Sequence, residues 1–347
     1  MGAEDDRPPG DMLYRAESNT ISKVNIQKVR YGAFFTKSSS WLTSSIRSAI
    51  ESTKIKSFAD PFAGEGDLLK HCLENFGGEI HGYDIDESLQ WETNDSLLSI
   101  PPSRRFLCIS NPPFLAKNSA RRKSMWSLVG HYFENSGRSD LYEIALDRCL
   151  NSFKHVVIIL PETFLHSSYS KERCQQIVIL QDNPFLDTTF PVCVTYWSPE
   201  TTSDPAIYVD DKYIMTYNEM MMIRKGVSRS RRVVFNDPGG NIGLRAVDGT
   251  ESSVRLKFIP GGEFDYPRDS IKVSSRAMTY ISIPELSTPL DVERFCINAN
   301  IILENYRKES SDIIFAGFKG NNNNGIRRRR LDYALARKIA IEALDRQ

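Results

Sequence analysis

What this sequence lacks already excludes several classes of protein. Its six cysteines form no C-x-x-C pair and its five histidines form no H-x-x-H or H-E-x-x-H spacing, so no metal site is indicated. No apolar run reaches the length that spans a membrane, and no signal peptide is recognisable. We therefore expect a cytoplasmic protein with reduced cysteines, without a metal and without a membrane partner.

An excess of charge of one sign is also lacking, since 44 Lys and Arg residues balance 44 Asp and Glu residues. The balance hides a difference between the halves: residues 1–200 hold 21 basic against 25 acidic residues, and residues 201–347 hold 23 against 19. A hydrophobic fraction of 40% over 347 residues allows a large core and favours two domains. The charges are compatible with a catalytic domain followed by a domain that faces nucleic acid.

The most informative stretch that is present is Asn111-Pro112-Pro113-Phe114, directly after the apolar run 106–109. The run predicts a buried strand of a parallel sheet. The two prolines predict an extended exit from this strand, without backbone N–H groups. What remains at the end of the strand is an amide side chain, carbonyl acceptors and an aromatic ring.

This set of groups suits the activation of an exocyclic NH2 group, for example on adenine. Asn111 and Pro112 would accept the two amine protons, so that the nitrogen recovers its lone pair, while Phe114 stacks on the base. The same residues are equally typical of a rigid turn after a strand. The choice between the two depends on whether the chain also binds a methyl donor.

A second informative stretch, residues 57–69, predicts the strand–turn–helix unit of a nucleotide-binding α/β fold. A short strand ends at Asp60, Gly64 and Gly66 lie in a turn, and a helix begins near Asp67. Glycines in such a turn let the backbone approach a ligand.

The strand expected over 79–86 adds further cofactor-binding candidates. Asp84, at its end, is placed to accept hydrogen bonds from ribose hydroxyls. Ile85 is placed to pack on an adenine face. Asp95 lies where a third strand should end and can accept from a cofactor's adenine amine, although an N-cap role fits it equally well.

Strands and helices alternate up to about residue 200, which predicts a doubly wound α/β domain. A helical period over 141–150 leads into a buried strand ending at Pro161, and 190–197 predicts a strand in a closing antiparallel hairpin. Beyond residue 200 the rhythm changes to short β-like runs between turns, which predicts a smaller α+β domain. The expected division is a disordered or extended lead over 1–27, a catalytic domain over 28–200 and a second domain over 201–347.

Three basic groups of residues are candidates for contact with DNA phosphates. One follows the Asn-Pro-Pro-Phe stretch without an intervening acid, one lies near 224–232, and one follows an Asn- and Gly-rich loop before an expected final helix. A solvated surface loop is the alternative for each. The candidate residues are Lys117, Arg121, Arg122, Lys123, Arg231, Arg232, Arg327, Arg328, Arg329 and Arg330.

The order of these segments resembles the S-adenosylmethionine-dependent amino-methyltransferases of DNA, in particular the gamma-type N6-adenine enzymes of restriction–modification systems. That family has a G-x-F-x-T turn, then D-P-x-x-G-x-G, an acid ending the second strand, N-P-P-[YF] and a C-terminal target-recognition domain. The resemblance covers about residues 30–197, and Lys37 stands where the family usually has proline. It implies a Rossmann-like sheet, S-adenosylmethionine as cofactor and double-stranded DNA as partner of a monomeric enzyme.

The resemblance also implies a role for each matching residue. The implied catalytic residues are Asn111, Pro112 and Phe114. The residues implied to stack on a flipped-out base are Phe114 and Phe190. The residues implied to bind the cofactor are Thr36, Asp60, Gly64, Gly66, Asp84, Ile85 and Asp95. Methylation of RNA, of cytosine N4 or of a protein glutamine stays open, because all of these substrates carry a conjugated NH2 group, and so does an inactive DNA-binding module.

Overall fold

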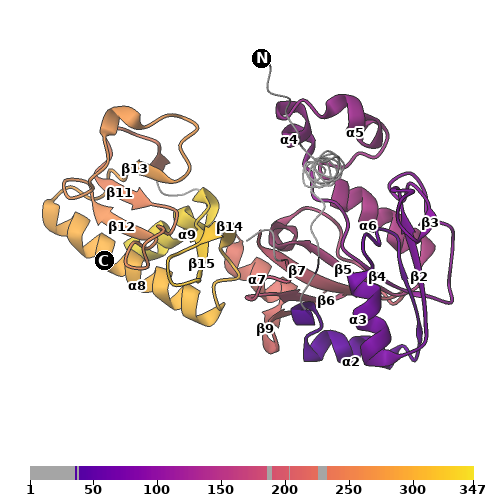
Figure 1. The fold of residues 1–347 in the computed structure, drawn as a ribbon. Helices are drawn as coiled ribbons and strands as arrows, with labels where there is room; N and C mark the ends of the chain where they lie inside the picture. The colour runs from indigo at the N-terminus through magenta and orange to yellow at the C-terminus, as the bar shows by residue number, and fades with distance from the viewer. Residues whose placement is uncertain (1–35, 37–38, 186–189, 203, 226–232) are drawn as a thin grey trace, which may run out of the picture. The chain divides into compact units, whose positions relative to one another are not determined.

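The computed structural model of the chain describes residue 36 and residues 39–185, 190–202, 204–225 and 233–347. These residues form two compact units, drawn as a ribbon in Figure 1. One unit contains Thr36 and residues 56–153, and the other contains residues 39–55 and the described residues from 154 to 347.

The first unit is a parallel sheet with one helix, α3, between β1 and β2 and three helices after β4. The strands hydrogen-bond in the order β3-β2-β1-β4, and every pair among them is parallel. The carboxyl ends of parallel strands meet at one edge, where α/β proteins bind ligands. The elements are β1 (Ser57–Asp60), α3 (Asp67–Phe76), β2 (Glu79–Asp84), β3 (Glu92–Thr93), β4 (Leu107–Ser110), α4 (Lys117–Arg122), α5 (Trp126–Glu134) and α6 (Leu141–Ser152).

Local sequence explains why these elements form. All four residues of β4 are buried, as the apolar run predicts. Helix α3 begins after Gly66, whose φ of 80° is left-handed, and it buries Leu68, Leu69 and Cys72. Helix α6 begins with a capping box, in which Asp140 accepts from the first helical turn and Glu143 accepts from the cap backbone.

The short helices α4 and α5 are held by a common apolar cluster. Ala120 of α4 and Val129 and Phe133 of α5 pack with Leu115 and Leu141 in this cluster. The packing fixes α5 beside the segment that follows β4, so its side chains can take part in a site at the strand ends.

The second unit contains a mostly antiparallel sheet with strand order β5-β7-β6-β8-β9. Strand β7 is antiparallel to both β5 and β6, which confirms the expected closing hairpin. Strand β8 pairs with β6 and β9 pairs with β8, so this sheet continues past residue 200. The elements are η1 (Ser39–Trp41), α2 (Ser44–Ser52), β5 (Val156–Pro161), η2 (Glu162–His166), β6 (Cys174–Ile179), β7 (Val192–Trp197), β8 (Ala206–Val209), β9 (Lys212–Thr216) and α7 (Tyr217–Arg224).

The same unit ends in the expected α+β part. A four-stranded antiparallel sheet has the order β10-β13-β11-β12, and α8 packs beside β12 and α9 (Figure 1). The sequence thus predicts the α/β class with a smaller α+β part correctly. The elements are β10 (Val234–Phe235), β11 (Ile242–Arg245), β12 (Lys257–Pro260), η3 (Arg268–Ser270), β13 (Met278–Ser282), α8 (Pro289–Glu309), β14 (Ala316–Asn321), β15 (Arg327–Arg330) and α9 (Tyr333–Leu344).

All six cysteines are buried and free, as their scattered positions predict. Among the helices of the described residues, none is long and apolar enough to cross a membrane. The described residues also contain no group of three or more His, Cys, Asp or Glu side chains suited to a metal ion.

Candidate cofactor and catalytic site

A cavity of about 400 Å³ opens at the carboxyl ends of the strands of the first unit. Residues of β1, the turn after it, the end of β2 and the segment after β4 line it, and α5 contributes a further wall. Its charges are of one sign, because the described residues that line it include no Lys, Arg or His. The acidic lining residues are Asp60, Glu65, Asp67, Asp84, Asp86 and Asp95.

Asp60, the last residue of β1, is the most buried of these acids, with 1% of its surface exposed. Its Oδ1 accepts hydrogen bonds from the Ser110 hydroxyl at 2.6 Å and from the Phe62 backbone N–H at 2.9 Å. Burial raises the pKa of Asp60 to about 7, although both hydrogen bonds favour its charged form. The group therefore responds strongly to any positive charge that a ligand brings into the cavity.

The glycine turn after β1 is held in place by Asp84 and Trp91. The Gly64 N–H donates to Asp84 Oδ2 at 2.8 Å, and the Gly64 carbonyl accepts from the Trp91 indole N–H at 2.8 Å. A Cβ on Gly66 would lie 2.4 Å from the indole ring, and the φ of 80° also favours glycine. Gly64 lines the cavity, and Gly66 gives α3 its start without lining it.

Asp84 and Ile85, which are predicted to contact ribose and adenine, lie at the end of β2 and line the cavity. Asp84 Oδ1 accepts from the Asp86 N–H at 2.9 Å, and each of its carboxylate oxygens can accept a second hydrogen bond. Ile85 lines the cavity with 62% of its surface exposed. An exposed apolar side chain beside a carboxylate suits the face and the hydroxyls of a nucleoside.

Asn111 lies in the wall of this cavity, next to the acids. Its amide Nδ2 donates to Thr36 Oγ1 at 3.3 Å, which orients the amide group. Thr36 is buried and also lines the cavity, so the structure brings these two predicted site residues together. Pro112 is buried and does not line the cavity, whereas Pro113 contributes to the lining.

Phe114 is buried in the fold, away from the cavity lining. It is only 9% exposed, does not line the cavity, and contacts the Tyr142 ring edge-to-face at 6.4 Å between centroids. Phe190 lies before β7 in the second unit, where its carbonyl accepts from the Asn183 amide at 2.9 Å. The stacking of these two rings on a target base stays a prediction.

Asp95 lines the cavity, and its carboxylate accepts one hydrogen bond from its own turn and one from α5. Its Oδ1 accepts from the Leu97 N–H at 3.2 Å, and its Oδ2 accepts from the Tyr132 hydroxyl at 2.8 Å. Tyr132 itself lines the cavity, together with Leu128 and Val129 of the same helix.

Sequence reasoning missed three residues of this site: Ser110, Trp91 and Tyr132. Ser110 gave a usable signal, because a hydroxyl at the end of an apolar strand needs a partner when it is buried. Trp91 and Tyr132 gave none, since their contacts with Gly64 and Asp95 exist only in the folded chain.

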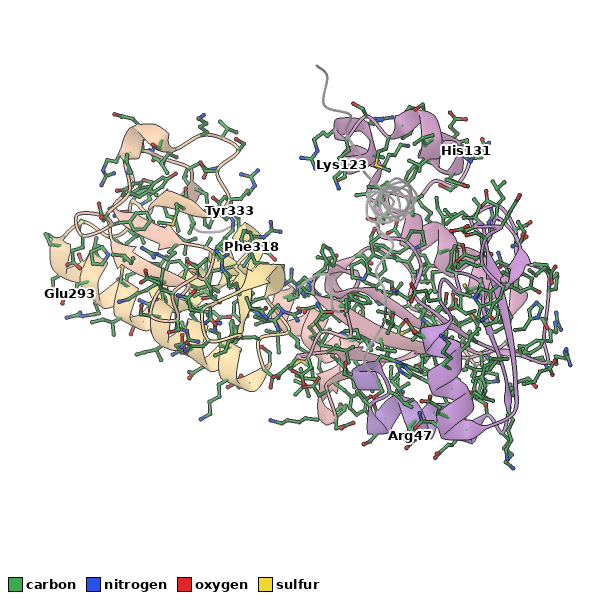
Figure 2. All side chains as sticks on the ribbon, in the orientation of Figure 1. Arg47, Lys123, His131, Glu293, Phe318 and Tyr333 are labelled. Carbon is green, nitrogen blue, oxygen red and sulfur yellow. The ribbon has the colours of Figure 1, made fainter. Side chains whose placement is uncertain are left out.

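The basic residues after the cavity-lining stretch are available for an anion. Arg121, Arg122 and Lys123 are exposed, and Figure 2 shows Lys123 beside α4. The Arg121 guanidinium lies 4.5 Å from the centroid of the Trp126 ring, and Lys117 lies 5.9 Å from it. Of the other predicted cluster, Arg231 and Arg232 lie outside the described residues.

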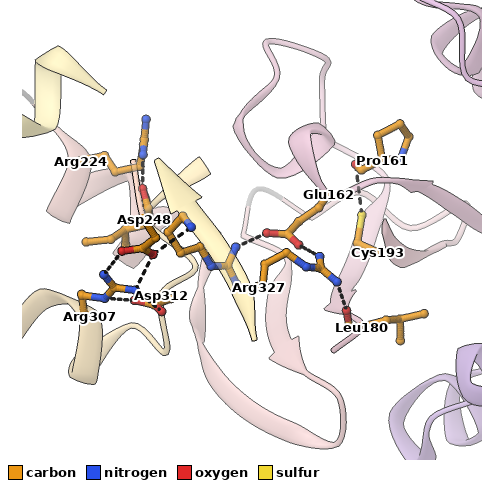
Figure 3. A network of polar contacts seen from close by, with 11 residues as sticks. Pro161, Glu162, Leu180, Cys193, Arg224, Asp248, Arg307, Asp312 and Arg327 are labelled. Atoms are coloured by element: carbon orange, nitrogen blue, oxygen red, sulfur yellow. Dashed lines mark hydrogen bonds and ion pairs between the residues drawn. The ribbon is translucent and has the colours of Figure 1, made fainter. Parts of the chain in front are cut away.

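The C-terminal arginines require a correction. Arg327 and Arg329 both form ion pairs with Glu162, whose side chain is 3% exposed, and their own side chains are 10% and 7% exposed (Figure 3). They lie on strand β15 and share one face of it, so they are internal structural groups and not loop residues that meet DNA phosphates. Arg328 donates to the Asp248 carbonyl at 2.8 Å, and only Arg330 of the four is classed as exposed.

No family model and no curated protein matches this chain. Parts of it are similar in structure to solved proteins, each at a low score. They are a type I restriction-modification system methyltransferase subunit from Streptococcus thermophilus (18% identity, 48% of this chain and 47% of that chain, TM-score 0.34), TrmN from Thermus thermophilus (12%, 44% and 48%, 0.29) and a TehB-like SAM-dependent methyltransferase from Corynebacterium glutamicum (15%, 53% and 98%, 0.29). The chain thus spans about half the length of the first two. Scores this low give no information on what this chain does.

Proposed function

We propose that this chain is a methyltransferase that moves a methyl group from S-adenosylmethionine to the N6 amine of adenine in duplex DNA. The observation that carries the proposal is the acidic cavity at the ends of β1 and β2 with Asn111 and Pro113 in its wall. A cofactor bound in this cavity would lie beside an amine-accepting group.

The charge of the cavity distinguishes between nucleoside cofactors. A dinucleotide such as NAD carries a pyrophosphate, which the acids at the start of α3, Glu65 and Asp67, would repel. S-adenosylmethionine carries a sulfonium and an ammonium group and no phosphate, so the six lining carboxylates attract it. The volume of about 400 Å³ lies in the range of small-molecule sites.

The predicted cofactor residues fit the parts of this molecule. Asp60 with Thr36 would hold the methionyl end, Asp84 would accept from the ribose hydroxyls, and Ile85 with Asp95 would flank the adenine. Gly64 brings the backbone into the cavity wall without a side chain. The cofactor supplies the electrophilic methyl group.

The residues after β4 would prepare the acceptor nitrogen. Asn111 Oδ1 and the Pro112 carbonyl accept the two protons of the amine, so that its lone pair becomes available for the methyl carbon. A C–N bond forms while the S–C bond breaks, and one amine proton leaves to solvent. Thr36 supports this step by holding Nδ2 of Asn111, which fixes which atom of the amide meets the amine.

DNA is the proposed polymer, and the target adenine has to leave the helix to reach the cavity. The exposed cations Arg121, Arg122 and Lys123 lie on the segment that follows the amine-accepting stretch, where they can hold phosphates. We assign target recognition to residues 201–347 and catalysis to 28–200. A modification enzyme of a restriction–modification system, acting as a cytoplasmic monomer, fits this assignment.

The test is methyl transfer from labelled S-adenosylmethionine to duplex DNA, to structured RNA and to protein in parallel, followed by digestion of the labelled polymer. The proposal expects label in DNA, on N6-methyladenine. Label on cytosine, in RNA or on glutamine would show that the proposed substrate is wrong, while the assignment of the cofactor would stand. An absence of both labelling and cofactor binding would refute the whole proposal.

A further inference from the structure

The turn after β3 is built to hold one carboxylate in a fixed place. The Asn94 N–H donates to the carbonyl of Asp84 at 2.9 Å, which ties the turn to the end of β2. The Leu98 and Ser99 N–H groups donate to the Asp95 carbonyl at 3.0 and 3.1 Å. These hydrogen bonds fix the backbone of Asp95 in the turn. The orientation of its side chain depends on further contacts.

Tyr132 orients that side chain. Its hydroxyl donates to Asp95 Oδ2 at 2.8 Å, while the Leu97 N–H donates to Oδ1 at 3.2 Å. The two donors hold opposite oxygens of one carboxylate, so the plane of the group is fixed. Tyr132 comes from α5, 37 residues further along the chain, and both side chains line the cavity.

The pair presents hydrogen-bond acceptors to the cavity. A carboxylate has no proton to give, and the Tyr132 proton is already used on Asp95, so the remaining lone pairs of both groups can only accept. The nearby Asn94 amide does not change this, because it donates to Ser96 Oγ and to the Ser99 carbonyl, both at 2.9 Å.

The wall beside the pair is apolar. Leu128, Val129 and Tyr132 have helical spacing i, i+1 and i+4 on α5, and all three line the cavity. Ile85 supplies an apolar surface from the end of β2. A planar heterocycle that packs on this apolar wall would meet the acceptors of the pair at its edge.

We propose that Tyr132 is a positioning residue, which fixes Asp95 so that the site selects a 6-amino purine over a 6-oxo purine in the cofactor. This inference rests on the proposed S-adenosylmethionine site. An exocyclic NH2 group can donate hydrogen bonds to Asp95. A 6-oxo group is itself an acceptor, so it would face the Asp95 carboxylate with no hydrogen bond between them. Tyr132 acts through Asp95 and takes no part in methyl transfer.

Calorimetric titration with S-adenosylhomocysteine and its 6-oxo analogue S-inosylhomocysteine tests this selection. The wild type should bind the amino compound at least about tenfold more tightly. Tyr132→Phe should reduce that ratio about 2- to 12-fold, the effect of one hydrogen bond. Asp95→Asn, which offers an NH2 donor, should abolish the preference, and the double variant should match Asp95→Asn alone.

A residue that merely packs would change both affinities by the same factor. If the ratio of the two affinities is the same in Tyr132→Phe as in the wild type, the inference is overturned while the proposed cofactor site stands. Failure of the wild type to bind either compound would overturn the inference together with the proposed function. Tyr213→Phe, on β9 of the other unit and outside the cavity lining, is the matched control and should leave the ratio unchanged.

Discussion

Ser110 donates its hydroxyl proton to Oδ1 of Asp60 at 2.6 Å, between the ends of two neighbouring parallel strands. The bond holds the carboxyl group of Asp60, which lines the acidic cavity and is almost fully buried. Because burial outweighs this hydrogen bond, the pKa of Asp60 rises to about 7. The cavity thus contains an acid that changes its charge near neutral pH.

We predict that cofactor binding strengthens as pH rises toward 7. A cationic ligand needs ionised Asp60, so below the pKa of about 7 binding must release a proton, and affinity should rise about tenfold per pH unit. Titration calorimetry with S-adenosylmethionine, which carries the sulfonium and ammonium charges, measures this slope between pH 5.5 and 6.5, and Asp60→Asn should flatten it.

Asp140→Asn is the matched control for this prediction. Burial raises the pKa of Asp140 to about 7 as well, but this residue caps α6 and does not line the cavity. Its variant should keep the wild-type slope. A slope that disappears in Asp140→Asn and persists in Asp60→Asn would remove Asp60 from the cofactor site.

Asp84→Ala should weaken cofactor binding by about 1.5–3 kcal/mol, the usual value of hydrogen bonds to a charged group. The loss combines the ribose contacts with the Gly64 N–H, which Asp84 holds in the cavity wall. Calorimetry gives the affinity, and circular dichroism checks that the fold persists. Glu87→Ala, at an exposed acid outside the cavity lining, is the control, and equal affinities for both variants would argue against a specific role of Asp84.

Glu162→Ala should destabilise the protein by about 3–5 kcal/mol, because it leaves two buried guanidinium groups, on Arg327 and Arg329, without their carboxylate. Urea unfolding measures the change in the free energy of unfolding. Exposed Glu172→Ala should shift that free energy by less than about 0.5 kcal/mol. An unchanged midpoint for Glu162→Ala would contradict the structural role of the network.

Neutralising the exposed cations of the α4 segment should weaken DNA binding and flatten its salt dependence. Each lost phosphate contact lowers the slope of log K against log salt by about 0.9, so Arg121→Gln, Arg122→Gln and Lys123→Gln together should show a large change. Fluorescence anisotropy at several salt concentrations reports it. The exposed Arg104→Gln should keep the wild-type slope, and a triple variant with that same slope would show that these cations are only solvated.

The parts of the site that sequence could predict are local. The Gly64–Gly66 turn follows directly from strand, turn and helix signals within a dozen residues, and Asn111 follows directly from a buried strand. Thr36 was predicted through the family resemblance, and the fold does bring it to Asn111.

The parts that sequence could not predict are contacts between distant segments. Ser110 meets Asp60 across 50 residues, and Arg327 meets Glu162 across 165, so no spacing or periodicity signals them. The sequence predicts that the arginine run adjoins a polar loop and contacts DNA, whereas the run forms strand β15, with Arg327 and Arg329 paired to Glu162. The two-residue period of a strand explains why Arg327 and Arg329 are buried together while Arg330 is exposed.

The role of Asn111 in activating the adenine amine can be measured by single-turnover methylation with saturating cofactor and DNA. Asn111→Ala removes one acceptor of the amine protons but leaves the acidic cavity and the basic α4 segment in place. We predict that the activation barrier for N6-methyladenine formation rises by about 2.7–4 kcal/mol, by analogy with the loss of one preorganised partner, so that the reaction slows. Affinity for S-adenosylhomocysteine and for DNA should stay close to wild type. An Asn111→Ala rate equal to the wild-type rate, or label that appears on cytosine or protein, would contradict the adenine mechanism.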